Sequence, residues 1–109
     1  MTKPVWLDEE ARSEVAAGHA RYEAVLPGLG EQFADELGTL LERIQFYPRA
    51  FPFAARVNRR LEVRHAVLPR FPFNVFFIEL DEAIWVLAVA HQKRRPQYWR
   101  KRIARRARH

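Results

Sequence analysis

The sequence predicts a single α+β domain in which a short N-terminal strand and a helix hairpin pack on an antiparallel sheet. Apolar residues recur every three to four positions through the first half of the chain, as they do on the buried face of a helix. In the second half they alternate or form short runs, as they do in strands. The chain has 109 residues and neither an internal repeat nor a Gly/Ser linker, so we expect one domain, residues 1–109.

The first half of the chain predicts one extended piece and two helices. Residues 4–7 are extended, and Asp8 can cap a helix from about Glu9 to Val25. Residues 26–30 form a tight connection, and a helical stripe then runs from Phe33 to about Phe46. Helices joined by so short a turn are expected to lie antiparallel. The charged positions of the first helix that we expect to face water are Arg12, Glu14, Arg21 and Glu23.

The second half predicts a loop and three strands. Residues 47–54, with two prolines, form the loop, and residues 61–67 alternate between apolar and polar side chains. Residues 73–80 and 83–91 are rich in aromatic and β-branched residues, and Asp81-Glu82 supplies a polar turn between them. The simplest arrangement is an antiparallel meander, which gives the element order β-α-α-β-β-β.

The last two predicted strands are apolar on both faces, although the chain has only one helix hairpin to cover them. Alternation places Phe73, Val75, Phe77 and Glu79 opposite Phe76, Ile78 and Leu80. In the next strand it places Ile84, Val86 and Ala88 opposite Trp85, Leu87 and Val89. The second face is therefore covered by the C-terminal tail, by self-association or by an apolar segment of another protein. The sequence leaves these alternatives open.

The tail, residues 92–109, is basic and contains aromatic rings. It carries no acid and nine bases: Lys93, Arg94, Arg95, Arg100, Lys101, Arg102, Arg105, Arg106 and Arg108. Pro96 suits the first turn of a helix, in which Tyr98 or Trp99 and Ile103 would hold one face to the sheet. Repulsion between like charges leaves open whether the tail is helical to its end or partly disordered. Such a run can bind phosphates and stack on bases.

Charge is distributed unevenly along the chain. Residues 1–43 carry nine acids and four bases, a net of −5, whereas residues 44–109 carry four acids and fifteen bases, a net of +11. If the halves form opposite faces, the basic face would attract nucleic acid, the ribosome or an acidic protein segment.

Other classes of protein are disfavoured by what the composition lacks. There is no cysteine, no secretory signal and no stretch of about 18 apolar residues, so we expect a cytoplasmic protein that does not enter the membrane. The four histidines have no metal-ligand spacing, so we expect neither a metal nor another cofactor.

Three segments in order, YEAVLPGLGEQF (residues 22–33), RFPFNVFF (70–77) and VLAVAHQKRRPQYWRKR (86–102), resemble the RelE/ParE superfamily of type II toxins. They are similar to the ParE-like subgroup of plasmid stabilisation systems, whose pattern is an arginine, Phe-Pro-Tyr, an aromatic strand, Ala-Val-x-His, basic residues, Pro and Trp. The resemblance implies a curved antiparallel sheet and a cognate antitoxin that wraps the toxin. It also implies growth inhibition, either by cutting mRNA in the ribosomal A site, as RelE does, or by poisoning DNA gyrase without cutting, as ParE does.

Two sets of candidate site residues follow. RNA cleavage needs a proton acceptor, cations beside the phosphate and a proton donor, for which the candidates are His91, Arg94 and Tyr98. Phenylalanines at positions 73, 76 and 77, where many relatives have tyrosines, remove hydroxyls from the central strand and favour binding over cleavage. The candidates for binding a target or an antitoxin are Arg64, Arg70, Phe73, Phe76, His91, Lys93, Arg94, Trp99, Arg100 and Arg102.

The leading hypothesis from the sequence is a ParE-like toxin that binds a macromolecular target, expected to be DNA gyrase, and is neutralised by a protein antitoxin. On this hypothesis the chain is not itself an enzyme. The first alternative is a RelE-like, ribosome-dependent mRNA endonuclease, and the second is a basic nucleic-acid-binding module. The oligomeric state, a homodimer or a heterotetramer with the antitoxin among the options, is left open.

Overall fold

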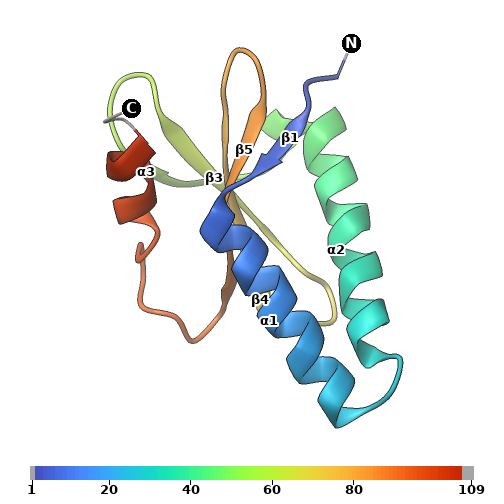
Figure 1. The fold of residues 1–109 in the computed structure, drawn as a ribbon. Helices are drawn as coiled ribbons and strands as arrows, with labels where there is room; N and C mark the ends of the chain where they lie inside the picture. Colours follow the sequence, from blue (N-terminus) through green and yellow to red (C-terminus); the bar gives the residue numbers. More distant parts are fainter. Residues whose placement is uncertain (1, 107–109) are drawn as a thin grey trace.

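The fold, taken from a computed structural model that describes residues 2–106, confirms the α+β class (Figure 1). The elements are β1 (Val5–Leu7), α1 (Glu9–Val25), α2 (Leu29–Phe46), a 3-10 turn η1 (Pro48–Ala50), β2 (Phe53–Arg56), β3 (Glu62–Val67), β4 (Phe73–Glu79), β5 (Ile84–His91) and α3 (Arg100–Arg106). The strands form one five-stranded sheet in the order β1-β5-β4-β3-β2.

The sheet contains the predicted meander and is wider than predicted. Strands β3, β4 and β5 pair antiparallel in sequence order, as expected. Strand β1 pairs parallel with β5, with Val5 opposite Ile84, so the sheet is mixed rather than purely antiparallel. Strand β2 pairs with β3 and begins at Phe53, inside the segment predicted to be a loop. The prolines and a register shift between Phe53 and Ala55 mark β2 as an irregular edge strand, which has no alternating pattern to detect.

The helix hairpin is confirmed (Figure 1). Helix α1 has the predicted bounds, and the Asp8 carboxylate accepts a hydrogen bond from the Glu10 N–H. Helix α2 begins at Leu29, earlier than the Phe33 of the apolar stripe. Gly28, with φ of 92°, makes the left-handed turn, and the Glu23 carboxylate accepts from the N–H groups of Gly28 and Gly30 at 2.9 and 3.0 Å. These bonds, that from Gly28 foremost, lower the pKa of Glu23. Glu23 therefore caps the first turn of α2 from the neighbouring helix.

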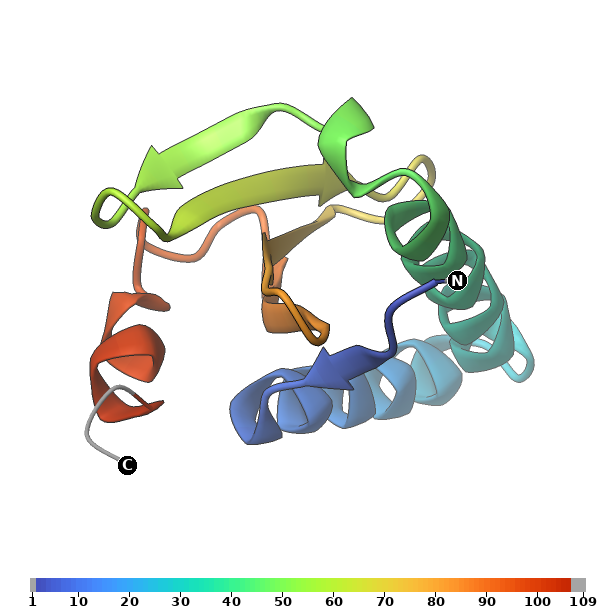
Figure 2. The ribbon, with the colours of Figure 1, turned by 90° about the horizontal axis from the view of Figure 1, so that it is seen from above.

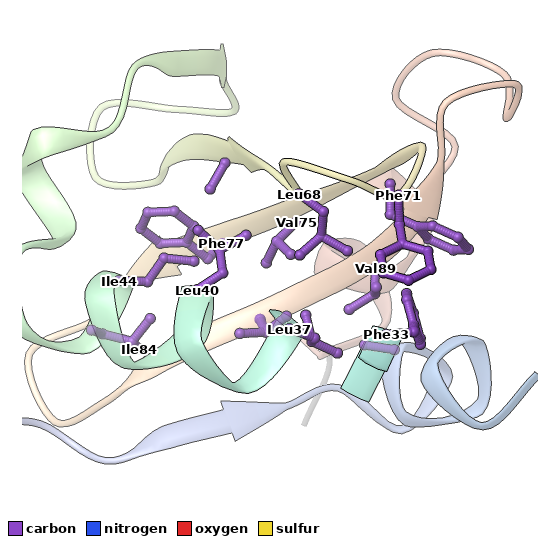
Figure 3. Packing of buried hydrophobic residues seen from close by; sticks show 14 residues of the cluster. Phe33, Leu37, Leu40, Ile44, Leu68, Phe71, Val75, Phe77, Ile84 and Val89 are labelled. Carbon is purple, nitrogen blue, oxygen red and sulfur yellow. The ribbon is translucent and has the colours of Figure 1, made fainter. Parts of the chain in front are cut away.

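One hydrophobic core lies between the helix hairpin and the sheet (Figures 2 and 3). Helix α2 supplies the predicted stripe, of which Phe33, Leu37, Leu40 and Ile44 are buried and Leu41 is half-buried. The Phe33 ring centroid lies 5.0 Å from that of Phe73 and 5.5 Å from that of Phe71, so an aromatic cluster closes one end of this core. Helix α1 packs closely against this core because its two buried positions, Ala11 and Gly18, are small residues.

A second core lies on the opposite face of the sheet, against α3 (Figure 2). Trp99 is 1% exposed and Ile103 5%, and both pack with Trp85 and Leu87 of β5 and Ile78 of β4. Of the alternatives that the sequence left open, the structure therefore favours the tail as the cover of this face. Within residues 2–106, no helix has both the length and the apolar composition that crossing a bilayer requires.

The faces of β5 differ from simple alternation. Between Phe76 and Phe77 the register shifts, since Phe76 is opposite Ala88 and Phe77 is opposite Val86. The extra residue, Leu87, is a bulge that reverses the alternation beyond it. Ala88 consequently joins the core under α3 and Val89 joins the core under the helix hairpin, the reverse of the predicted sides.

The tail is helical, but α3 begins at Arg100 rather than at Pro96. Residues 96–99 form turns, and Gln97 has φ of 59°, a left-handed conformation that is incompatible with a continuing right-handed helix. Arg108 and the rest of residues 107–109 lie outside the described part of the chain.

Two glycines of α2 provide a matched test of the helix hairpin. A Cβ at Gly30 would lie 2.7 Å from the His19 carbonyl oxygen, a backbone atom that cannot move aside, whereas a Cβ at Gly38 meets nothing within 4 Å. We expect Gly30→Ala to lower the free energy of unfolding by about 1–3 kcal/mol. We expect Gly38→Ala to raise it by about 0.5–1 kcal/mol. Urea denaturation measures both, and equal effects of the two variants would contradict the close approach of α1 and α2.

Candidate functional site

Arg102 connects α3 to α1 and to the sheet. Its side chain is 6% exposed, and its Nη1 and Nη2 atoms donate to the two carboxylate oxygens of Glu14 at 2.9 and 3.0 Å. Nε donates to Glu10 at 2.7 Å, and Nη1 also donates to the Leu87 carbonyl at 2.7 Å. Burial disfavours the charge of Arg102, but the hydrogen bonds and the charge of Glu14 outweigh it and raise its pKa. A bidentate pair of this kind fixes orientation as well as distance.

Tyr98 belongs to the same network. Its hydroxyl donates to the Glu14 carboxylate, which also accepts from the Val89 N–H at 3.0 Å. Burial foremost, and then the hydrogen bond to Glu14, raise the pKa of Tyr98. The Arg94 guanidinium lies 4.1 Å from the centroid of the Tyr98 ring, and that of Arg102 lies 4.9 Å from it. The hydroxyl is therefore held as a proton donor in a structural hydrogen bond.

The acidic and basic halves of the chain meet at this network. Arg105 donates to Glu10, and its Nη2 lies 3.2 Å from an Asp8 carboxylate oxygen. Three acids at the start of α1 thus neutralise two bases of α3. Glu14, predicted to face water, is instead largely covered, with its side chain 19% exposed. The predicted charge asymmetry is partly balanced inside the molecule.

Three of the aromatic candidates for binding belong to the cores. Phe73 is 5% exposed and Trp99 1%, so neither offers a surface to a partner. Phe76 is half-buried, with its ring centroid 5.5 Å from that of Trp99. Together with the buried Arg102, these side chains hold the fold together.

The three candidates for catalysis are only partly brought together. Arg94 contacts the ring of Tyr98, as described above. His91, at the end of β5, is half-buried, lies edge-on to the Phe73 ring at 5.3 Å and accepts at Nδ1 from the Lys93 N–H at 3.1 Å. Within the described part of the chain, no hydrogen bond joins the His91 ring to Arg94 or Tyr98.

Arg64 and Arg70 lie on other parts of the surface. Nη1 of Arg64 donates to the Phe51 carbonyl, and its guanidinium lies 4.3 Å from the centroid of the Phe53 ring. Nε and the backbone N–H of Arg70 donate to Glu36 at 2.8 and 2.7 Å. Burial opposes ionisation of Glu36, but these bonds and the Arg70 charge prevail and lower its pKa. This pair lies in a groove between α2 and the loop before β4, lined by Asp35, Glu36, Thr39, Leu40, Arg43, Pro69 and Arg70.

The residues that sequence reasoning missed are carboxylates, chiefly Glu10, Glu14 and Glu36. Glu10 and Glu14 are four positions apart, which places them on one face of α1, and this spacing is the only sequence signal for their shared role. Their partner lies 88 or more positions away in the chain, beyond the reach of local patterns.

Removing the charge of Glu14 should release α3. We expect Glu14→Gln to lower the free energy of unfolding by about 3 kcal/mol, because it leaves much of the buried Arg102 charge unpaired. Glu9→Gln, an exposed first-turn position that makes no ion pair among the described residues, is the matched control and should change stability by less than about 0.5 kcal/mol. Urea denaturation compares them, and equal stability of the two variants would contradict the role of Glu14.

Acid should weaken the same contact. The hydrogen bond from Arg105 foremost, and the charges of Arg102 and Arg105, hold the pKa of Glu10 below its ordinary value of 4.5 in the folded protein. This stabilisation is complete above the unfolded pKa and is lost as the pH falls through the folded one. The urea midpoint should therefore drop as the pH is lowered below 4.5, and drop less in Glu10→Gln. The same pH dependence in both proteins would show that other carboxylates control it.

Comparison with solved structures finds a similar chain. It comes from a structure described as "Chromosomal ParDE TA system from P. aeruginosa", with a TM-score of 0.68 and 16% sequence identity. The alignment covers 82% of this chain and 95% of that chain. No protein-family model and no curated protein sequence matches. The likeness therefore lies in the fold: the arrangement of strands and helices described above is shared with a chain of a ParDE TA system.

Proposed function

We propose that this chain is the toxin of a type II toxin–antitoxin system and that it acts, as ParE-like toxins do, by binding a macromolecular target. The observation that carries the proposal is the shared fold, which extends over 95% of a chain from a ParDE TA system. The sequence segments around Arg70 and His91 point to the same group of toxins independently of the fold.

The chemistry of the candidate residues supports binding rather than cleavage. The Tyr98 hydroxyl is engaged by Glu14, and the Nδ1 atom of His91 accepts from the backbone. An acid or base catalyst needs a proton-transfer group within reach of the substrate and with a pKa near the working pH. The raised pKa of Tyr98 lies further from the working pH than the ordinary pKa of a tyrosine does. We therefore keep the RelE-like endonuclease as the alternative and DNA gyrase as the proposed target.

A protein antitoxin is the proposed partner, and the structure changes where we expect it to bind. Helix α3 packs on the second face of the sheet, where Trp6 and Val67 remain exposed, whereas Phe46, Tyr47 and Phe53 are exposed elsewhere. The groove of Glu36 and Arg70 lies on the helix hairpin side and combines polar and apolar lining. We propose that the antitoxin occupies this side of the molecule, where Arg70 offers a guanidinium that is 66% exposed.

Expression of the chain without an antitoxin tests the proposal. We expect growth arrest with induction of the DNA-damage response, and recovery of gyrase with the tagged protein. Immediate arrest of translation with mRNA cut in the ribosomal A site would instead establish the RelE-like alternative. Unimpaired growth, with the full-length protein detected in the soluble fraction, would contradict both.

His91→Ala separates the two activities further. If the toxin acts by binding, ribosomal A-site cuts should be absent with the unmodified protein and with the variant alike, and the variant should remain folded, since the lost hydrogen bond to the Lys93 N–H contributes only about 1 kcal/mol to stability. If His91 takes part in proton transfer, mRNA cleavage should fall by roughly 100-fold or more. Counting surviving colonies and mapping mRNA ends in the same cultures distinguishes the outcomes.

A further inference from the structure

Helix α3 divides its side chains among three directions. Trp99, just before the helix, and Ile103 point to the sheet core, as their burial shows. Arg102 and Arg105, three positions apart, bind the acids of α1. Arg100 and Lys101 are exposed, and neither makes an ion pair with a described carboxylate. The five bases of α3 are thus divided into two that pair with carboxylates, Arg102 and Arg105, two that face water, Arg100 and Lys101, and Arg106, whose guanidinium lies 4.9 Å from the centroid of the Trp85 ring.

The loop before α3 adds three exposed cations to Arg100 and Lys101. Lys93, Arg94 and Arg95 are all exposed, and none pairs with a carboxylate among residues 2–106. We call the five side chains Lys93, Arg94, Arg95, Arg100 and Lys101 the cationic surface. No acid occurs between Ala83 and the end of the chain, so nothing in this part of the sequence offsets the charge.

The surroundings of the cationic surface argue against a protein partner. Protein interfaces centre on buried aromatic and aliphatic anchors with a polar rim. The large hydrophobic residues exposed in the described structure are Trp6, Val25, Leu26, Phe46, Tyr47, Phe53 and Val67. None of them belongs to the loop or to α3, and Trp6 lies under the Arg106 guanidinium, which is 5.6 Å from its ring centroid. A surface with cations and no apolar anchor fits a polyanion that is bound through its charges alone.

The aromatic rings nearby exclude a second mode of recognition. Single strands are bound by stacking of bases on exposed aromatic side chains. Trp99 is buried in the core, and the Tyr98 ring is contacted by the guanidinium groups of Arg94 and Arg102. The cationic surface therefore offers no free ring for a base, which favours a duplex whose bases are already stacked and whose phosphates face outward.

Groups able to read bases or a 2′-hydroxyl are equally scarce. Gln97 is engaged by the Nε of Arg100, which leaves Gln92 as the side-chain amide beside these cations. Contacts to phosphate fix position but carry no sequence information. The partner is thus recognised by its backbone charge, with no preference for sequence.

We propose that the cationic surface binds the phosphate backbone of double-stranded DNA without sequence specificity. The choice of DNA over RNA rests on the proposed function, since a toxin that poisons gyrase acts on an enzyme that holds duplex DNA. In such a complex the surface would add direct contacts between toxin and DNA to those between toxin and enzyme.

Fluorescence anisotropy with purified full-length protein and a labelled duplex of mixed sequence tests the proposal. Five contacts predict a slope of about −4.5 for log K against log salt. In the triple variant Arg95→Gln, Arg100→Gln, Lys101→Gln the slope should become shallower by about 3. The matched control, Arg12→Gln, Arg21→Gln, Arg43→Gln, removes the same charge from exposed positions of the helix hairpin and should bind DNA as the unmodified protein does.

Several outcomes would overturn the proposal. Equal loss of affinity in the two triple variants would mean that net charge alone attracts DNA. Tighter binding of a single strand, of duplex RNA or of polyglutamate than of duplex DNA at the same salt concentration would assign the surface to another class of partner. Circular dichroism of each variant verifies the fold. The assay contains neither gyrase nor cells. A negative result would therefore refute DNA binding without bearing on the proposed toxin function. Conversely, an absence of toxicity in cells would not bear on the affinity of the protein for DNA.

Discussion

The buried contact between Arg102 and Glu14 is the interaction on which the rest of the structure depends. A guanidinium taken out of water needs partners for its donors, and here two carboxylates and one carbonyl accept four hydrogen bonds from it. Because Glu14 also accepts from Tyr98 and from the backbone of β5, one carboxylate orients the helix, the turn before it and the strand beneath it. Trp99 and Ile103 contribute hydrophobic burial, and the ion pair determines where that burial occurs.

This arrangement separates bases that stabilise the fold from bases that remain available. Arg102 and Arg105 pair with the acids at the start of α1, whereas the cationic surface is formed by the loop before α3 and by the first two residues of α3. A single basic run in the sequence therefore serves two purposes that its composition cannot distinguish. The acids at the start of α1 make the distinction, since the bases of α3 within their reach form ion pairs, and one of these bases, Arg102, is buried.

Most of the fold was predictable because it depends on local periodicity. The bounds of α1 and the stripe of α2 follow from apolar spacing, and the meander follows from three apolar or alternating runs. The errors arise where local patterns carry no information. The bulge at Leu87 reverses the faces of β5, and β2 is an irregular edge strand. The candidate site was predicted less well, because burial of Trp99 and Arg102 depends on partners far away in the sequence.

The pairing of β1 with β5 has a consequence for how the protein forms. Val5 is opposite Ile84, and Glu10 and Glu14 pair with Arg102, so residues 5–14 acquire these partners only after residues 84–102 have been synthesised. Contacts between such distant segments slow folding, because a long loop must close before any of them forms. On the ribosome, the helix hairpin can assemble early while the sheet edge and α3 cannot. The contacts of β1 with β5 and of α1 with α3 therefore form late, after synthesis of α3.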